Sequence, residues 1–483
     1  MIEFTKKTFL ENIPDYIIDI AETLQKAHFQ SYLVGGSIRD ILLGKTPLDF
    51  DVATNAYPEE IQKIFPKNVP TGAKFGTVTV IGTSKSSENY DVQITTYRNE
   101  ADYFGGRWPA KVEFARTIEE DLSRRDYTIN AIALDLQNFD DTNKDVTELL
   151  VDPFNGISDL KSGILKAVRD PMERLTEDGL RAVRACRLAS QLGFQIEPET
   201  YKAITETNHI TAQVSVERFK DELVKILYKS AKPSVGLKLL RESGILKIFI
   251  PELLEGINVV QPEFHTDDVF EHSLKTCDLA EDRVKLAALF HDIGKSRTRM
   301  EDNKGIHFYG HDVVGAQMTE EIMRRLKFSN EEIERTTRLV RWHMFYYPSA
   351  DWRKSEDDLK KGEDKGWTDG AIRRLIINVG GEEGIDDLLR LRIADATSNP
   401  KNDFDPKELD ELASRVAAVR ANDMALKITD LDITGQDLMS NFNLEPGQKL
   451  GETLKYLLEK VLDEPALNKK LDLLRLAKDY LKL

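Results

Sequence analysis

Two aspartates one residue apart lie in the segment DFDVAT, whose apolar and β-branched residues favour a strand. In a strand, alternate side chains share a face, so the carboxylates of Asp49 and Asp51 would point the same way and repel each other. Mg²⁺ removes this repulsion, because it binds a few carboxylates together with the phosphate oxygens of a substrate. The spacing therefore predicts that Asp49 and Asp51 are catalytic residues that bind Mg²⁺.

A pair of glycines precedes these aspartates in the segment LVGGSIRDILLG. Gly35 and Gly36 would let the backbone approach a triphosphate closely, and the first amides of a following helix can donate hydrogen bonds to it. Arg39 would lie in the first turns of that helix, where its guanidinium could bind phosphate. The segment thus predicts a nucleotide-binding turn beside the magnesium site.

A second carboxylate and arginine pair occurs in the segment EDGLR. Asp178 and Arg181 are three residues apart on a predicted helix, so they would be neighbours on one face. The carboxylate only accepts hydrogen bonds and the guanidinium only donates them. Cytosine and adenine each present an amino donor beside a ring-nitrogen acceptor, whereas uracil and guanine present the reverse. The pair could therefore select C and A, although the same spacing is common in surface ion pairs.

Another set of candidate residues combines imidazole and carboxylate groups in a helical part of the chain. They are His272, His291, Asp292, His311, His343 and Asp395. Such ligands suit Mn²⁺ or a divalent transition metal such as Ni²⁺ or Fe²⁺, and an adjacent His-Asp pair can direct both side chains into one cleft.

The elements that must position these residues change character along the chain. Residues 10–30 are predicted to be helical, and 31–136 alternate strand-like runs with helices and loops, which is typical of a small α/β or α+β domain. The polar, Gly- and Pro-containing segment 99–110 predicts a mobile loop. After about residue 160 the chain is predicted to be almost entirely helical, with the charged run 352–366 as an exposed insertion.

Composition limits the class of protein. The 483 residues exceed a single ordinary core, and the 41% hydrophobic and 31% charged content fit a globular protein of two to four domains without a membrane span. Cys186 and Cys277 are too few for a disulfide framework, and the N-terminal segment lacks a signal-peptide pattern, so a cytoplasmic location is expected. The net charge of −16 disfavours nonspecific nucleic-acid binding, whereas clustered arginines favour selective contact with a nucleic acid or nucleotide.

Four blocks in the first half of the chain resemble the bacterial tRNA CCA-adding enzymes and their poly(A) polymerase relatives. They are LVGGSIRDILLG with DFDVAT, RRDYTINAIAL (similar to RRDFTINA), DPMERLTEDGLRAVRACRLASQLGF and SVERFKDEL. The resemblance implies template-free addition of C, C and A to tRNA 3′ ends from CTP and ATP. It also implies nucleotide contacts at Gly35, Gly36, Arg39, Arg98, Arg125, Asp126, Asn130, Asp178, Arg181, Arg184 and Arg187, and metal binding at Asp49 and Asp51.

One position departs from the family pattern. Relatives often have a glutamate where this chain has Gln93, so a third carboxylate ligand stays open, with Asp91 on the same strand face as a substitute. Arg98 and the segment 99–110 match the family's mobile segment linked to addition of the terminal A, which favours an enzyme that adds A.

The histidine and aspartate series has a resemblance of its own. LFHDIGK, HFYGHDVVGA and VRWHMF resemble blocks of the HD phosphohydrolase superfamily. The match implies one metal at His272, His291, Asp292 and Asp395, a second metal that His311 and His343 could bind, and Lys295 near a substrate phosphate. An active domain of this kind would hydrolyse 2′,3′-cyclic phosphates or phosphomonoesters.

The expected fold class is α+β. The resemblance implies a nucleotidyltransferase head with a mixed β-sheet at 1–150, a helical neck at 151–230 that recognises the base, a helical body with the HD domain at 231–405, and a helical tail at 406–483. Three alternatives stay open: a CC-adding or A-adding enzyme, a poly(A) polymerase, or an HD hydrolase whose head only binds RNA. The sequence does not distinguish a monomer from a homodimer.

Overall fold

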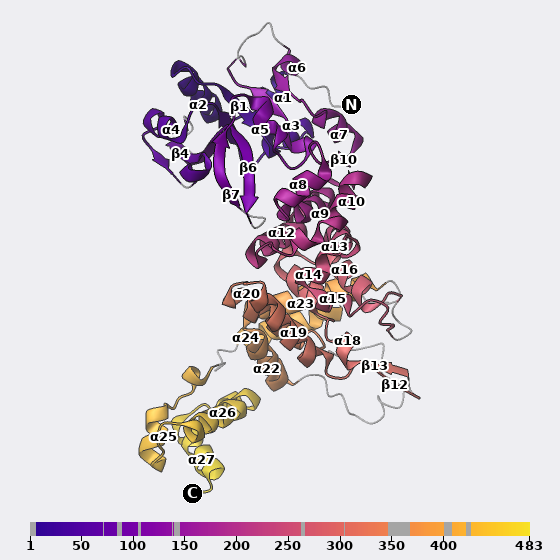
Figure 1. Ribbon diagram of the computed structural model, residues 1–483. Coiled ribbons are helices and arrows are strands. Elements are labelled where there is room, and N and C mark those ends of the chain that lie inside the picture. Colours follow the sequence, from indigo (N-terminus) through magenta and orange to yellow (C-terminus); the bar gives the residue numbers. More distant parts are fainter. Residues whose placement is uncertain are drawn as a thin grey trace. The chain divides into compact units, whose positions relative to one another are not determined.

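The computed structural model describes residues 6–70, 72–84, 89–104, 108–137, 139, 145–261, 266–303, 305–345, 368–399, 408–421 and 427–483 (Figure 1). The chain divides into two compact units, Met1–Phe249 and Ile250–Leu483. The first unit contains a mixed β-sheet followed by helices, and the second is mainly helical, which confirms the α+β class. The boundaries expected at 150, 230 and 405 stay predictions. The charged run 352–366 lies outside the described residues.

A mixed sheet forms the centre of the first unit. Its strand order is β3-β4-β5-β2-β1-β8-β9, in which β2 and β5 run parallel and the other neighbouring pairs run antiparallel. The strands are β1 (Ser31–Val34), β2 (Asp51–Thr54), β3 (Asn68–Val69), β4 (Thr77–Thr83), β5 (Asn89–Thr96), β8 (Ala133–Asp135) and β9 (Leu150–Val151).

Alternating burial shows how the sheet positions polar side chains. In β5, Val92 and Ile94 are buried in the core, whereas Asp91 and Gln93 point to the opposite, exposed face. Gln93 lies opposite Asp51 across the parallel β2–β5 pair. The sheet therefore presents the aspartate and the glutamine side by side on its polar face.

Short helices surround this sheet. They are α1 (Lys6–Asn12), α2 (Asp15–Lys26), α3 (Gly36–Leu42), α4 (Pro58–Ile64), η1 (Ala73–Phe75), α5 (Ile118–Ser123), η2 (Thr128–Asn130), α6 (Val146–Leu149) and α7 (Gly156–Ser162). The buried side chains of α2 recur at Ile17, Ile20, Ala21 and Leu24, the spacing of an amphipathic helix. Helices α1 and α2 confirm the helical prediction for residues 10–26 apart from the break at 13–14, whereas the predicted helix at 27–30 is wrong, because the chain turns there toward β1.

The expectation of a loop at 99–110 is wrong for its described residues, which form two strands. Strands β6 (Arg98–Phe104) and β7 (Trp108–Phe114) form an antiparallel hairpin, with Arg98 opposite Phe114 and Phe104 opposite Trp108 (Figure 1). Tyrosine, phenylalanine and tryptophan favour paired strands, and this preference outweighs the polar and glycine-rich composition that suggested a loop. Residues 105–107 lie outside the described residues.

The remaining part of the first unit is helical, as predicted. Its elements are α8 (Pro171–Glu177), α9 (Leu180–Leu192), α10 (Pro198–Glu206), α11 (Asn208–Thr211), α12 (Val216–Lys229), α13 (Pro233–Glu242), α14 (Ile245–Phe249) and the two-stranded pair β10 (Ile164–Leu165) and β11 (Gln195–Ile196). Helix α9 packs against α12 and α13 through an almost continuous buried side.

The second unit consists mainly of helices. They are α15 (Pro251–Leu254), α16 (Val269–Leu279), η3 (Asp282–Val284), α17 (Lys285–Phe290), α18 (Lys295–Thr298), α19 (His311–Arg325), α20 (Asn330–Trp342), α22 (Asp369–Val379), α23 (Glu382–Ser398), α24 (Glu408–Ala421), η4 (Ile428–Asp430), α25 (Gly435–Phe442), α26 (Gln448–Asp463), η5 (Pro465–Leu467) and α27 (Lys470–Leu481). A hairpin of β12 (Met300–Asp302) and β13 (Gly305–His307) joins α18 to α19. Across the described ranges, every helix is too short or too polar to cross a bilayer.

Candidate active site and metal centre

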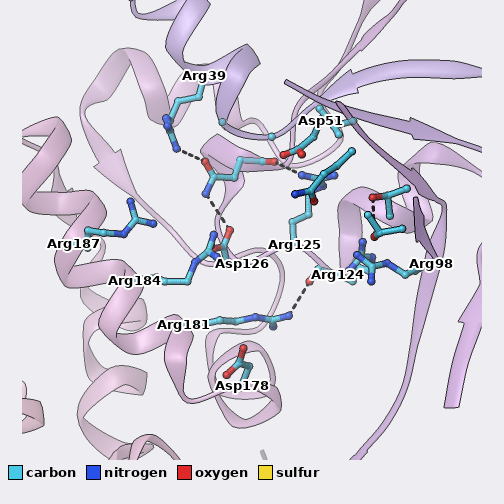
Figure 2. A pocket seen from close by; sticks show the side chains of 17 residues that line it. Arg39, Asp51, Arg98, Arg124, Arg125, Asp126, Asp178, Arg181, Arg184 and Arg187 are labelled. Carbon is cyan, nitrogen blue, oxygen red and sulfur yellow. Dashed lines mark hydrogen bonds and ion pairs between the residues drawn. The ribbon is translucent and has the colours of Figure 1, made fainter. Parts of the chain in front are cut away.

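A polar cleft of about 530 Å³ lies in the first unit (Figure 2). It is lined by Val34, Gly35, Gly36, Arg39, Asp51, Thr77, Gln93, Thr95, Arg98, Arg124, Arg125, Asp126, Asn130, Asp178, Arg181, Arg184 and Arg187. Every residue predicted to contact the nucleotide is in this set. The cleft concentrates positive charge in an acidic protein, as a triphosphate site requires.

Gly35 turns the chain from β1 into α3 at the edge of the cleft. Its φ of +80° is in a region that L-residues with a side chain rarely adopt. A Cβ atom at this position would lie 3.0 Å from Nη1 of Arg125. The glycine is therefore needed both for the turn and for the close approach of the arginine.

The two aspartates near residue 50 lie close together but not on one strand. Asp51 is the first residue of β2, whereas Asp49 lies two residues before the strand begins and is exposed. The prediction that both occupy a strand is wrong for Asp49, because the partner strand β1 ends at Val34, which pairs with Asp51. Burial raises the pKa of Asp51, Arg125 opposes that shift, and the charge of Asp49 raises the pKa further.

A chain of hydrogen bonds connects α3 to α9 through the cleft (Figure 2). Arg39 Nη1 donates to Asn130 Oδ1 at 2.8 Å, and Asn130 Nδ2 donates to Asp126 Oδ1 at 3.1 Å. Asp126 Oδ2 in turn forms an ion pair with Arg184 Nη2, at a distance of 2.7 Å. Although burial alone would raise it, Arg184 and the Asn130 hydrogen bond hold the pKa of Asp126 at about 2, so this carboxylate is ionised.

The carboxylate of Asp121 accepts hydrogen bonds from three other arginines that line the cleft. It accepts hydrogen bonds from Arg124 Nη2 at 3.0 Å, from Arg125 Nη2 at 3.3 Å and from the backbone N–H of Arg98 at 3.1 Å. Burial would raise the pKa of this carboxyl, but the two guanidinium groups and the Arg98 amide lower it. The sequence analysis did not identify Asp121, whose only signal is its spacing of three and four residues before the two arginines.

Asp178 and Arg181 both line the cleft, but they are not neighbours on one helix face. Asp178 has an extended backbone between α8 and α9, and Arg218 binds its carboxylate with two nitrogens, at 3.1 and 2.6 Å. The extended backbone of Asp178 itself interrupts the predicted helix, and α9 begins only after Gly179, so the expected i, i+3 geometry is wrong. Arg218 was not predicted as a site residue, although it lies in the quoted block SVERFKDEL.

Arg181 is held by neighbouring protein groups. Its Nη1 donates to Arg174 O at 2.8 Å and to Glu177 Oε2 at 2.5 Å, and its Nη2 donates to Arg124 O at 3.0 Å. Arg187 is similarly paired with Glu222, a buried carboxylate on α12. Both arginines are thus fixed in place at the wall of the cleft.

Asp91 and Gln93 are the two residues of β5 that were considered as a third metal-binding side chain. Gln93 lines the cleft opposite Asp51, and Asp91 is absent from the residues that line it. Thr77 and Thr95, which were not predicted, lie beside Gln93, with their hydroxyl oxygens 3.1 Å apart.

The six histidines and aspartates predicted as metal ligands in the second unit lie together in one buried centre. Two groups form within it: His272, His291 and Asp292, and Asp292, His311 and His343, each with ligand atoms within 4.8 Å of one another. Asp292 belongs to both groups, because its Oδ2 lies 3.2 Å from His291 Nε2 and its Oδ1 lies 3.5 Å from His311 Nε2. Asp395 joins the first group, with its Oδ1 3.0 Å from His272 Nε2.

Hydrogen bonds on the far side of each ring orient these histidines. The Nδ1 atoms of His291, His311 and His343 lie 2.7–2.9 Å from the carbonyl oxygens of Ala288, Phe308 and Val340. An Nδ1–H that donates to a carbonyl leaves Nε2 available as a ligand. Nε2 atoms of His311 and His343 then face each other at 3.3 Å, an arrangement that a shared cation would stabilise.

Lys295 lies at the edge of this centre. Its Nζ donates to Asp292 Oδ2 at 2.6 Å and to Gln261 Oε1 at 2.7 Å. Although burial would raise it, the charges of His291 and Lys295 hold the pKa of Asp292 well below its ordinary value. The donor set of imidazoles and ionised carboxylates therefore fits a divalent transition metal or Mn²⁺.

Family models match most of the chain in order. They are the poly(A) polymerase head domain at 31–166, the RNA and SrmB-binding site of polymerase A at 193–256, the HD domain at 265–399 and tRNA nucleotidyltransferase domain 2 at 380–477. The first and third of these domains imply the use of divalent metals, and the histidine and aspartate groups of the second unit agree with this for the HD domain.

Curated relatives decide the family. A CCA-adding enzyme of Lactococcus lactis subsp. cremoris strain MG1363 is 34% identical over 481 residues, which are 98% of this chain and 99% of the relative. The chain belongs to the CCA-adding enzymes. Another member, from Ligilactobacillus salivarius, is 44% identical over 241 residues, which are 49% of this chain and 56% of the relative.

Solved structures of CCA-adding enzymes share the fold. The Bacillus stearothermophilus enzyme in complex with CTP is 24% identical and has a TM-score of 0.65, over 96% of this chain and 97% of the other. The Thermotoga maritima CCA-adding enzyme complexed with tRNA is 18% identical and has a TM-score of 0.53, over 99% of both chains. These comparisons confirm the family resemblance and the fold predicted from the sequence blocks.

Proposed function

We propose that this CCA-adding enzyme attaches C, C and A to the 3′ end of tRNA from CTP and ATP, without a nucleic-acid template. The near full-length identity to a Lactococcus CCA-adding enzyme carries this conclusion. The cleft supports it, because an aspartate, a glycine turn and a row of arginines lie together there. Structural neighbours in complex with tRNA, CTP and ATP support the same substrates.

In the proposed reaction the tRNA 3′-hydroxyl attacks the α-phosphorus of CTP or ATP, and pyrophosphate leaves. Mg²⁺ held by Asp49 and Asp51 would supply activation of the attacking oxygen and charge neutralisation of the leaving group. Arg39, Arg125 and Arg184 bind the triphosphate, and their fixed partners Asn130, Asp121 and Asp126 keep their guanidinium groups in place.

Base selection falls to Asp178 and Arg181. Asp178 accepts the amino group of cytosine or adenine and Arg181 donates to the adjacent ring nitrogen. Arg218 holds the Asp178 carboxylate through two hydrogen bonds, and the Leu180 N–H also donates to Asp178 Oδ1 at 3.0 Å, so Oδ2 is the oxygen that keeps a lone pair for the base. Uracil and guanine would leave the groups of both residues unpaired, so they bind poorly.

Three tRNA substrates test this function and its alternatives. The purified enzyme is incubated with tRNA that ends before CCA, with tRNA-C and with tRNA-CC, with CTP and ATP supplied separately and together. We expect two additions from CTP, one from ATP on tRNA-CC and no further extension. ATP use on tRNA-CC without any CTP use on tRNA that lacks CC would indicate an A-adding enzyme, CTP use alone a CC-adding enzyme, and repeated ATP use a poly(A) polymerase.

The HD centre supports a second activity, hydrolysis of 2′,3′-cyclic phosphates or phosphomonoesters at damaged RNA ends. The observation that favours it is the pair of ligand groups that share Asp292, with Lys295 beside them to bind phosphate. We propose Mn²⁺, Ni²⁺ or Fe²⁺ for this centre, because imidazoles outnumber carboxylates in it. Loss of hydrolysis in His291→Ala/Asp292→Ala with unchanged CCA addition would support two separate sites, and hydrolysis that persists would contradict this activity.

The proposal extends to the organisation of the chain. We propose a head at 1–150, a base-reading neck at 151–230, an HD-containing body at 231–405 and a tail at 406–483. The action on tRNA supports the cytoplasmic location expected above.

A further inference from the structure

The side chain of Tyr127 joins the phosphate-binding part of the cleft to the base-reading part. Tyr127 directly precedes η2 and is completely buried. Its hydroxyl donates a hydrogen bond of 2.5 Å to the backbone carbonyl of Arg181, a residue 54 positions away in sequence. The tyrosine thus contacts the main chain of the arginine to which base selection is assigned above.

Other hydrogen bonds connect the same two segments. Arg181 Nη2 donates in the opposite direction to the carbonyl of Arg124, at 3.0 Å (Figure 2). The backbone N–H of Tyr127 donates to Asp126 Oδ1 at 2.9 Å, and Asp126 also binds Arg184 at 2.7 Å. Tyr127 therefore lies where the segment 124–127 is held to the start of α9 by hydrogen bonds and an ion pair.

We propose that Tyr127 is a positioning residue that sets the separation between Arg181 and the phosphate-binding arginines, and thereby strengthens discrimination against UTP and GTP. This inference rests on the proposed function. A nucleotide links its base to its α-phosphorus through a short covalent frame, so a site that reads one end and reacts at the other must hold its two halves at a matching distance. A loosened Arg181 would reach partners on a wrong base more easily.

The hydroxyl can be removed without leaving a buried polar group unsatisfied. The carbonyl of Arg181 lies in the first turn of α9, where it also accepts the helical hydrogen bond from the amide four residues later. Phenylalanine occupies the equivalent place in the block RRDFTINA that this segment resembles, so the ring alone suits the local fold. Tyr127→Phe should therefore change function more than stability.

Tyr97→Phe provides a matched control in the same unit. Tyr97 is also completely buried in the hydrophobic core, it does not itself line the cleft, and its hydroxyl donates to Oε1 of the exposed Gln30 at 3.3 Å. The two variants lose the same atom from a buried ring of the same unit. A general loosening of the sheet domain would affect both.

The test is the ratio of kcat/KM for CTP to kcat/KM for UTP, measured by single additions to tRNA that ends before CCA. We expect Tyr127→Phe to lower this ratio about fivefold to tenfold, as suits the loss of one buried hydrogen bond, and Tyr97→Phe to leave it unchanged. Both variants are assayed at a temperature at which circular dichroism shows them to be folded. A lower stability of either variant then does not affect the comparison.

The outcomes separate this inference from the function on which it rests. A wild-type enzyme that adds CCA, combined with an unchanged CTP/UTP ratio in Tyr127→Phe, would overturn the role of the tyrosine alone. An equal fall of the ratio in both variants would also overturn it, because the effect would then be general. A wild-type enzyme that adds no CCA would overturn the proposed function itself.

Discussion

Arg218 binds the carboxylate of Asp178 with both terminal nitrogens, at 3.1 and 2.6 Å. The two residues come from different helical segments, since Asp178 lies between α8 and α9 and Arg218 lies on α12. The carboxylate that we propose reads the base is thus oriented by a residue 40 positions away and not by the arginine three positions away.

Arg218→Ala should impair nucleotide addition without changing the residues that touch phosphate. Asp178 would lose its two charge-assisted hydrogen bonds and keep the weaker one from the Leu180 N–H, so its carboxylate would be less firmly oriented and kcat/KM for CTP and ATP should fall about tenfold to a hundredfold. Primer extension with each nucleotide measures the loss. Arg218→Lys retains the charge but not the bidentate geometry, and should recover only part of the activity. Full activity in Arg218→Ala would contradict the orienting role.

Gly35→Ala should abolish most nucleotide binding. The new methyl group would lie 3.0 Å from Arg125 Nη1 and would demand a backbone conformation that alanine rarely adopts. Gly193→Ala is the matched control, because Gly193 also has a positive φ, +71°, but nothing within 4 Å of the added carbon. Gly193→Ala should lose about 1 kcal/mol of stability, and Gly35→Ala more, because its ψ of −135° lies outside the left-handed helical region that Gly193 occupies. CTP binding measured by calorimetry should be lost in Gly35→Ala alone, and equal binding by both would contradict the close-approach account.

Asp126 should make stability depend on pH at the acid end. Its pKa in the folded protein is about 2, below that of an unfolded aspartate, so its ion pair stabilises the fold above about pH 4 and this contribution disappears as the pH falls toward 2. The shift corresponds to about 2 kcal/mol. The difference in unfolding free energy between wild type and Asp126→Asn should therefore shrink from pH 6 to pH 2.5. A constant difference would show that ionisation of Asp126 does not contribute.

The HD centre should bind two transition-metal ions that share Asp292. His311 and His343 belong to one ligand group only, and His272 belongs to the other. Metal analysis of protein loaded with Mn²⁺ or Ni²⁺ should therefore find two ions per chain in this centre, and one in His311→Ala/His343→Ala. His307→Ala is a suitable control, because its Nε2 pairs with Asp302 on the β12–β13 hairpin. Equal metal content in all three proteins would contradict the shared-ligand arrangement.

The sequence predicted much of the site, and the physical reason differs between residues. Gly35, Gly36 and Arg39 were found because a turn and a helix start are local features that short-range spacing can indicate. The convergence of Asp126, Asn130 and Arg184 with them depended on the family blocks, since no local pattern relates residues on η2 to residues on α9. The hydrogen bond between Arg39 and Asn130 and the ion pair between Asp126 and Arg184 are products of tertiary packing.

The errors also have identifiable causes. Asp178 was placed on a helix because EDGLR has helical spacing, but its backbone is extended. The next residue, Gly179, lies so close to the chain at Ile210 that an added Cβ atom would be 2.7 Å from the Ile210 carbonyl oxygen. The hairpin β6–β7 was taken for a loop because its composition was judged by polar residues and glycine. At Asp178 the long-range pairing with Arg218 outweighed a local preference, whereas in the hairpin the strand preference of the aromatic residues outweighed the polar composition.

The measurement that tests the central claim most directly is nucleotide incorporation by Asp49→Ala/Asp51→Ala on tRNA that ends before CCA, with CTP and ATP present. The control is Asp91→Ala, which removes a carboxylate from the same sheet outside the residues that line the cleft. The account predicts complete CCA addition by the wild type and by Asp91→Ala, and no incorporation by the double variant in spite of a normal fold. Incorporation that persists in the double variant would contradict it.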